Sequence, residues 1–118
     1  MTVDKITIAA GRMSEMVKFY SRVLGIDLEP ISLYSTTLYS GRFGKIECML
    51  CPKEIAGVEA EINTVQLRFV VEDVKLAFAT ATGLGAVILS KPQDMDGRLM
   101  AAVRDPDGNS LELAESAE

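Results

Sequence analysis

The sequence predicts an α+β fold built from two units of the same order: strand, helix, then three strands. Two observations lead to this prediction. The spacing of apolar residues changes twice from a period of two to a period near 3.6. Each helical stretch also ends at a Leu-Gly pair that opens a strand, Leu24-Gly25 in the first half and Leu84-Gly85 in the second. A repeated order indicates an internal duplication, and because neither half can bury a helix-on-sheet core well alone, the halves must pack together or exchange between chains.

The first half begins with a predicted strand over 3–10, where isoleucine and alanine alternate with other residues. A helix is predicted over 13–24, because apolar residues recur there at helical spacing and Gly25 is a suitable stop. Three short strands follow, at 26–33, 36–40 and 45–51. The stretch 53–61 is polar and interrupted by Gly57, so it is interpreted as a linker.

The second half repeats this order. A strand is predicted over 63–71, and a helix begins at Asp73, whose carboxylate suits the N-cap position. Three further strands are predicted, at 86–89, 99–104 and 110–114. The segment 105–109, with the sequence DPDGN, forms a tight turn between the last two strands. The chain therefore divides into a first module at 1–52, a linker at 53–61 and a second module at 62–118.

Composition restricts the class of protein. The chain has 118 residues, of which 48% are hydrophobic and 25% charged, as in ordinary globular domains. No apolar run approaches the ~18 residues needed to span a bilayer, and the N-terminus lacks the pattern of a secretion signal. We therefore expect a soluble, cytoplasmic protein with no membrane partner. The net charge of −5, without a Lys/Arg stripe, is a poor match for nucleic acid and favours a cationic ligand at long range.

The chain has no histidine, which excludes three-His zinc sites, His-based triads and Cys-His pairs. Its two cysteines, Cys48 and Cys51, lie in a predicted strand. Three residues of extended chain separate their Cα atoms by roughly 10 Å, too far for a disulfide. The odd spacing also turns the two thiols to opposite faces. We interpret both as buried structural residues rather than a redox pair.

Three segments carry a family resemblance: MVKFYSRVLG over 16–25, FVVEDV over 69–74 and DPDGNSLEL over 105–113. Together they resemble the vicinal oxygen chelate superfamily, which includes glyoxalase I, extradiol dioxygenases, and bleomycin and fosfomycin resistance proteins. The likeness covers nearly the whole chain. It implies paired βαβββ modules whose curled mixed sheets surround a cavity, with the helices packed on the outer face. It also implies a homodimer, since short members commonly pair modules across chains.

Members of this family that use a metal place one ligand on the first strand and one on the last strand of each module. The resemblance assigns these positions to Lys5, Glu47, Gln66 and Glu112. Strand alternation independently turns polar residues of these strands away from the apolar faces. The predicted ligand-binding cavity therefore contains Lys5, Thr7, Glu47, Gln66, Arg68 and Glu112.

Each of these residues has an alternative interpretation. Glu47 and Glu112 are the best candidates for catalytic groups, or they are solvated carboxylates. Gln66 is a cavity group or a structural hydrogen-bonding residue, and Arg68 either clamps an anionic ligand or pairs with an acid. Three aromatic residues face the cavity or pack against the sheet; these are Tyr34, Tyr39 and Phe43.

The charge at position 5 decides whether this cavity suits a metal. Glu47, Gln66 and Glu112 would supply three oxygen ligands for a hard divalent ion. A protonated Lys5 about 4 Å from that ion is repelled by roughly 8 kcal/mol at an effective dielectric near 20. We therefore expect no metal or other cofactor, with the Lys5 ammonium held between the two carboxylates and the Gln66 oxygen. If Thr7 faces the centre instead, the repulsion disappears and a divalent metal is the alternative.

Two functions follow from these alternatives. The first is a small-molecule-binding protein that resembles glyoxalase and bleomycin resistance proteins and has a metal-free cavity. The second is a divalent-metal-dependent lyase or dioxygenase, in which Glu47 or Glu112 acts as ligand and base. An interaction module with a vestigial cavity is a third possibility, and a metal-free enzyme that uses Lys5 as a base is the least favoured.

Overall fold

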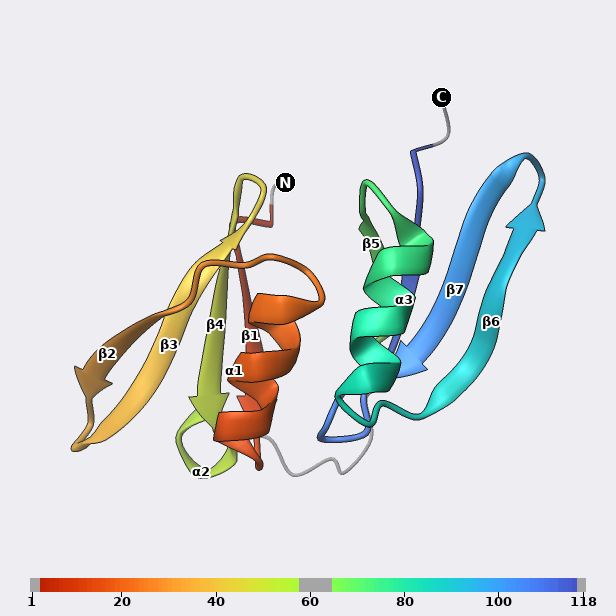
Figure 1. The fold of residues 1–118 in the computed structure, drawn as a ribbon. Helices are drawn as coiled ribbons and strands as arrows, with labels where there is room; N and C mark the ends of the chain where they lie inside the picture. The colour runs from red at the N-terminus through yellow and green to blue at the C-terminus, as the bar shows by residue number, and fades with distance from the viewer. Residues whose placement is uncertain (1–2, 58–64, 117–118) are drawn as a thin grey trace.

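The computed structural model describes residues 3–57 and 65–116, which form two four-stranded mixed sheets with helices packed against them (Figure 1). The elements are β1 (Lys5–Ala10), α1 (Met13–Arg22), β2 (Glu29–Leu33), β3 (Thr36–Phe43), β4 (Ile46–Pro52), α2 (Lys53–Ala56), β5 (Leu67–Val70), α3 (Val74–Gly83), β6 (Ile88–Met95), β7 (Arg98–Arg104) and β8 (Ser110–Ala114). The predicted α+β fold with two βαβββ units is confirmed.

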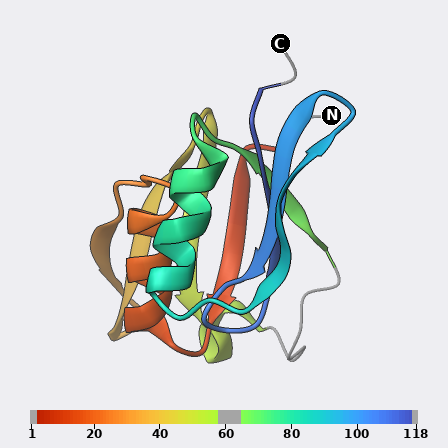
Figure 2. The same ribbon diagram turned by 45° about the vertical axis from the view of Figure 1, so that its right-hand side comes forward.

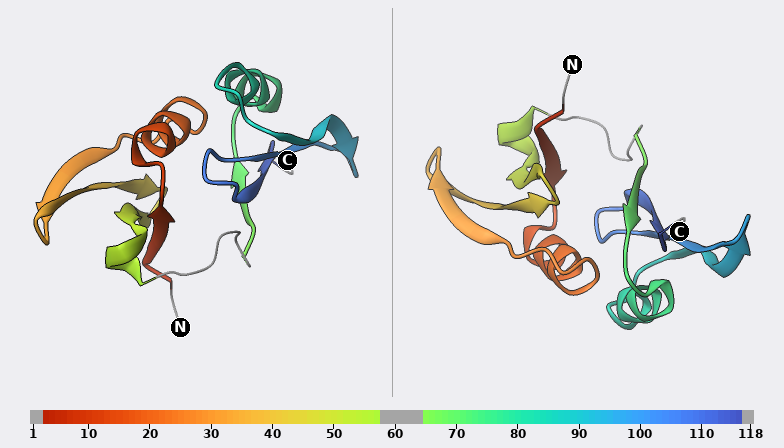
Figure 3. Two further views of the ribbon diagram at one scale, coloured as in Figure 1. Left: turned by 90° about the horizontal axis from the view of Figure 1, so that it is seen from below. Right: turned by 90° about the horizontal axis from the view of Figure 1, so that it is seen from above.

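The two sheets have the same topology. Their strand orders are β1-β4-β3-β2 and β5-β8-β7-β6, and in each the first strand of the module pairs in parallel with the last. The other neighbours are antiparallel. Figure 3 shows β1 and β5 as the innermost strands, with α1 and α3 on the same side of both sheets. Because the sheets have equivalent topology, corresponding strands of the two modules carry their side chains in the same way.

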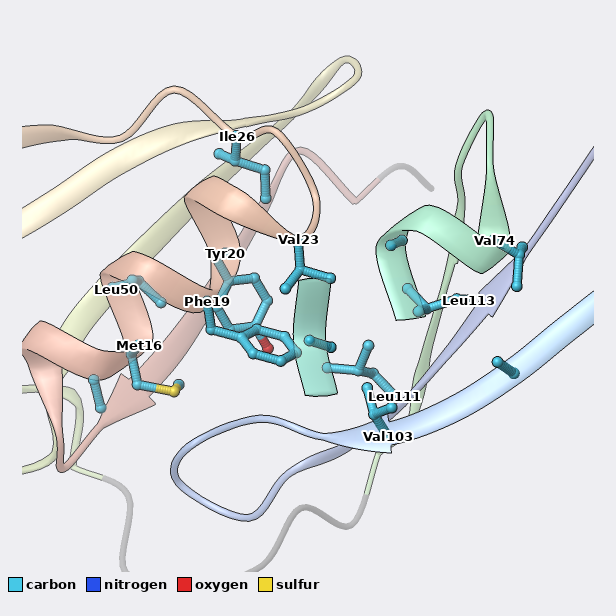
Figure 4. Close-up of a cluster of buried hydrophobic side chains, with 14 residues drawn as sticks. Met16, Phe19, Tyr20, Val23, Ile26, Leu50, Val74, Val103, Leu111 and Leu113 are labelled. Atoms are coloured by element: carbon cyan, nitrogen blue, oxygen red, sulfur yellow. The ribbon is translucent and has the colours of Figure 1, made fainter. Parts of the chain in front are cut away.

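The hydrophobic core fills the space between the two long helices and the sheets (Figure 4). Both modules contribute to this one cluster, which includes Met16, Phe19 and Tyr20 from α1, Val74, Ala77 and Ala81 from α3, and Leu50, Ala101, Val103, Leu111 and Leu113 from the strands. The helices lie next to each other over these residues (Figure 2). In this chain the modules therefore share a core, as their limited individual apolar surface requires.

Strand alternation leaves a second side of the sheets, turned away from α1 and α3, which we call the rear face. It carries the strand residues that alternate with the core residues, among them Lys5, Thr7, Glu47, Met49, Arg68, Val70, Met100, Ala102 and Glu112. The short helix α2 packs against β1 and β4. Most polar residues of the predicted cavity thus lie on one side of the molecule.

An aromatic cluster joins the modules. The rings of Phe43 in β3 and Phe69 in β5 lie with centroids 5.0 Å apart, and Tyr20 of α1 lies 6.4 Å from Phe69. Phe43 is therefore a packing residue of the core and not a cavity aromatic. Tyr39 also packs against the core, whereas Tyr34 is 72% exposed in the turn between β2 and β3.

A buried carboxylate connects the DPDGN turn to α1. Asp105 is only 4% exposed, and the Tyr20 hydroxyl donates a hydrogen bond to it at 2.9 Å. The backbone N–H groups of Asp107 and Asn109 and the Asn109 side-chain amide donate to the same carboxylate. Burial raises the pKa of Asp105, and the four donors compensate for the lost hydration of its charged form.

The next acid of this turn makes a second connection. The carboxylate of Asp107 accepts hydrogen bonds from the backbone N–H groups of Gly11 and Arg12, at 2.7 and 2.9 Å. These groups precede α1, so their N–H donors have no helical partner of their own. The turn is thus structural, and it ties the second module both to the start of α1, through Gly11 and Arg12, and to its last turn, through Tyr20.

Three boundaries differ from the predictions because packing overrides local signals. The strand predicted from residue 26 begins at Glu29, and a side chain on Gly41 would come within 2.7 Å of the Ile26 side chain and 2.9 Å of the Asp27 carbonyl. The strand predicted at 36–40 is β3, which continues through Gly41 to Phe43, so this glycine is a position of close approach inside the strand. The strand predicted at 86–89 is β6, which runs on to Met95 as an edge strand, where a proline is tolerated.

Two further differences concern the region between the modules. The predicted linker at 53–61 begins with α2, and its residues 58–61 lie outside the described ranges. The strand predicted over 63–71 begins at Leu67, with residues 63 and 64 also outside those ranges. Within residues 3–57 and 65–116, no helix combines the length and apolar character that a membrane crossing needs.

The two cysteines are buried free thiols on β4, as predicted. Alternation along the strand turns Cys48 toward the helices and Cys51 toward the rear face. Burial raises the pKa of Cys48 to about 12, with a smaller contribution from the neighbouring Glu47 carboxylate. A thiol in this state is a poor nucleophile at neutral pH, which agrees with a structural role.

The hydrogen bond between modules makes a stability prediction. Replacing Tyr20 by Phe keeps the ring in the core but removes one donor from the buried Asp105. We expect this variant to lose about 1.5–3 kcal/mol of unfolding free energy, measured by urea denaturation. Tyr34→Phe, which removes an exposed hydroxyl, is the control and is expected to change stability by less than about 0.5 kcal/mol. Equal transition midpoints for the two variants would show that the bond does not hold the modules together.

Candidate functional site on the rear face

The first module places a cation next to a carboxylate on the rear face. In the parallel pairing of β1 and β4, Lys5 lies directly opposite Glu47, while Arg42 of β3 flanks Glu47 on its other side. The Ser40 hydroxyl donates to Glu47 through a long bond of 3.4 Å. Lys5 is exposed and has no hydrogen bond or ion pair within the described residues. Its backbone thus adjoins that of Glu47, while its ammonium forms no ion pair with a described residue and is available to a ligand.

The second module repeats this arrangement with an arginine. Arg68 of β5 lies opposite Glu112 of β8, and its Nε donates to a Glu112 carboxylate oxygen at 3.0 Å. The side chains are 46% and 29% exposed. An ion pair this exposed contributes at most about 1 kcal/mol to stability. The alternative in which Arg68 pairs with an acid is therefore confirmed, and the pair orients two polar groups more than it stabilises the fold.

The register places Arg68, and not Gln66, opposite Glu112, as it places Lys5 opposite Glu47. Counted from the helix that follows each first strand, however, Lys5 corresponds to Gln66 and Thr7 to Arg68. Gln66 precedes β5, and its amide nitrogen donates to the Ser110 hydroxyl at 3.1 Å. The pattern of alternation alone does not distinguish these positions, since both residues are turned to the same face.

The expected contact of Lys5 with both carboxylates is not formed in the described part of the chain. Glu112 is paired with Arg68, and within those residues no hydrogen bond or ion pair links the two modules' pairs. The Lys5 charge instead acts on Cys51, whose pKa is raised by burial and partly lowered by this ammonium. Thr7 also faces the rear, opposite Met49, so Lys5 and not Thr7 is level with Glu47.

The residues at the four family positions are poorly suited to a divalent metal. One of them, Lys5, is a cation opposite Glu47, and a second cation, Arg68, lies opposite Glu112 although it is not itself a family position. A guanidinium about 4 Å from a divalent ion is repelled by roughly 8 kcal/mol at an effective dielectric near 20, and Lys5 adds a second repulsion. Across the described residues, no three His, Cys, Asp or Glu side chains gather in a metal-binding set.

A separate hollow of about 420 Å³ lies on the helix side, and the sequence did not indicate it. Its walls come from both modules: Arg12, Glu15, Lys18 and Phe19 on one side, and Leu84, Gly85, Ala86, Val87, Asp105 and Pro106 on the other. The buried carboxylate at its floor, Asp105, already accepts four hydrogen bonds from the protein. Because its buried acceptor is satisfied, this hollow is a weaker candidate than the rear face.

The chain matches a known protein family in sequence and resembles known structures in fold. A sequence model described as the Glyoxalase/Bleomycin resistance protein/Dioxygenase superfamily matches residues 2–113. No curated protein matches the chain. Among solved structures, a glyoxalase-related enzyme from Fulvimarina pelagi has a TM-score of 0.78 at 20% identity, with 98% of this chain and 88% of that chain covered.

Two further structures cover 98% of both chains. One is a glyoxalase/bleomycin resistance protein/dioxygenase family enzyme from Burkholderia phytofirmans PsJN, with a TM-score of 0.76 at 20% identity. The other is TioX from Micromonospora sp. ML1, with a TM-score of 0.72 at 22% identity. At these identities the structural likeness concerns the fold.

The charge arrangement makes a metal-binding prediction. Replacing both cations, as Lys5→His with Arg68→His, removes the positive charges and places a neutral nitrogen ligand beside each carboxylate. We expect this double variant to bind zinc at least about tenfold more tightly than the unmodified protein, measured by isothermal titration calorimetry. Thr7→His is the matched control, because it adds an imidazole to the same face but not level with Glu47. If Thr7→His gained as much zinc affinity as the double variant, the metal position would lie beside residue 7 and not beside Lys5.

Proposed function

Because the chain belongs to the glyoxalase/bleomycin resistance protein/dioxygenase superfamily, we propose that it is a small-molecule-binding protein whose rear-face site works without a metal ion. One observation carries this proposal: on the first strand of each module, a cation lies level with the carboxylate of the last strand. The negative charge that would attract a metal ion is thereby balanced by Lys5 and Arg68.

The same arrangement suits ligand binding. Lys5 and Arg68 offer hydrogen-bond donors and Glu47 and Glu112 offer acceptors, all on paired strands that restrict their movement. Apolar side chains adjoin them on the rear face, including Met49, Val70 and Met100. A surface with a few placed polar groups among apolar ones is typical of small-molecule sites. This is the chemistry of a sequestering protein of the kind that bleomycin resistance proteins represent.

We propose that a second copy of the chain completes the cavity, giving a homodimer. In the single chain the rear face is open: Lys5, Thr7 and Arg68 are exposed, and the apolar Val70 of β5 is 62% exposed. A partner placed over this face would enclose the polar pairs and bury Val70. Enclosure strengthens electrostatic and hydrogen-bond contacts with a ligand because it excludes water.

The metal-free site is tested by elemental analysis of the purified protein, followed by thermal shift with divalent ions and with a chelator. We expect substoichiometric metal in the purified protein. We also expect no change in melting temperature with either addition, because no ion binds the folded state and stabilises it. The double variant Lys5→His/Arg68→His serves as the positive control for ion-dependent stabilisation. Tightly bound stoichiometric metal in the unmodified protein would contradict the proposal and favour a metal-dependent lyase or dioxygenase.

The dimer is tested by size-exclusion chromatography with light scattering. We expect a mass of twice the chain, and a shift toward the monomer for Val70→Glu, which places a charge in the interface. Leu76→Glu is the matched control, since Leu76 is similarly exposed but lies on α3, on the other side of the molecule. A monomer at all concentrations would contradict the shared cavity.

A further inference from the structure

Charge is unevenly distributed between the rear face and the rest of the chain. The strands place five cations and three carboxylates on this face: Lys5, Arg42, Arg68, Arg98 and Arg104 with Glu29, Glu47 and Glu112. The rear face therefore carries a net charge of +2, although the whole chain carries −5. Among the other described residues, acids outnumber cations by four, so the acidic character of the described part of the chain lies outside this face.

Most of this positive charge is not neutralised by acids. Three of the arginines bind neutral backbone carbonyls, which fix the guanidinium groups without cancelling their charge. The acceptors are the carbonyls of Gly44 and Lys45 for Arg42, of Glu115 for Arg98 and of Gly108 for Arg104. The face thus holds ordered cations that stay electrostatically available.

Two cations of the rear face also keep free donors. Arg68 uses only its Nε toward Glu112, so within the described residues its two terminal nitrogens have no partner. Lys5 has no hydrogen bond or ion pair there at all. The terminal nitrogens of a guanidinium form a fork that matches a carboxylate or phosphate group, and an ammonium supplies three further donors.

We infer that the rear face binds organic anions, with the free donors of Arg68 or Lys5 receiving an oxyanion group and the apolar side chains next to that residue receiving the rest of the molecule. This inference rests on the proposed function and specifies its ligand class. The net charge of −5 favours cations only at long range, and salt screens charges beyond about 8 Å at physiological ionic strength. The groups that touch the ligand therefore decide its sign.

The two carboxylates, Glu47 and Glu112, restrict which kind of anion can bind. Glu112 accepts a hydrogen bond from Nε of Arg68, so the two terminal nitrogens of the guanidinium are the donors presented to a ligand. Glu47 lies beside Lys5 and repels an anion that approaches from its side. A single oxyanion at one end of an apolar molecule fits this pattern better than a compact multivalent anion, whose further charges would meet Glu47 or Glu112.

Matched probes with one ring system test the inference. Isothermal titration calorimetry compares 1-naphthylacetate, 1-naphthyl phosphate, the neutral 1-naphthylacetamide and the cationic 1-naphthylmethylammonium. We expect 1-naphthylacetate to bind at least about tenfold more tightly than the amide, and the difference to shrink at high salt. Tighter binding of 1-naphthylacetate than of the phosphate would assign the site to carboxylates, and the reverse to phosphate monoesters.

Charge-removing variants locate the preference. Arg68→Gln and Lys5→Gln are expected to reduce the advantage of the acetate over the amide, most of all at the cation that holds the carboxylate. Arg22→Gln, on the last turn of α1 and off the rear face, is the control and is expected to keep the full advantage. Circular dichroism confirms that each variant folds.

The outcomes separate this inference from the proposed function. Equal affinity for the acetate and the amide, or tightest binding of the ammonium probe, would overturn the anion preference and leave a small-molecule-binding protein. An advantage of the acetate that survives both Arg68→Gln and Lys5→Gln would overturn the assignment to this face. Absence of saturable binding by all four probes would overturn the inference together with the proposed function.

Discussion

The buried carboxylate of Asp105 holds the two modules in one arrangement. A carboxylate in a core is costly unless donors surround it, and one of its four donors, the Tyr20 hydroxyl, belongs to the other module. Separating the modules would leave this group without one partner while also exposing the shared apolar core. The relative position of the two sheets, and with it the composition of the rear face, depends on this contact. The turn that carries Asp105 is therefore where the fold and the site are linked.

Duplication explains why the candidate site consists of two like pairs. In each module the first and last strands are parallel neighbours, so residues at one level face the same way and their side chains adjoin. Both modules pair a cation with a carboxylate on these strands, Lys5 with Glu47 and Arg68 with Glu112, although the two cations do not stand at equivalent positions of the duplication. The second pair forms an ion pair and the first leaves its ammonium free, which shows that the copies have diverged in detail.

The sequence predicts the faces of the strands well and their register poorly. A period of two assigns Glu47 and Arg68 to the polar side, because that choice depends on neighbours in the same strand. The level at which two strands meet depends on helices and turns elsewhere, so Gln66 and Arg68 were indistinguishable as the partner of Glu112. Gly41 illustrates the same limit: a glycine required by the approach of Ile26 in three dimensions has the same local signal as a turn.

The electrostatics of the two rear-face pairs link the proposed metal-free site to the ligand class inferred for it. The two carboxylates, Glu47 and Glu112, attract positive charge, which one divalent ion or two side-chain cations would supply. This chain has Lys5 and Arg68 on the neighbouring strands. Their charges belong to side chains of the protein, so a chelator cannot remove them as it would remove a bound metal ion. A metal ion attracts ligand oxygens through open coordination positions, whereas these cations attract them through the N–H donors left over after pairing. The exchange removes Lewis acidity but keeps the attraction for oxyanions, and so it favours binding over catalysis.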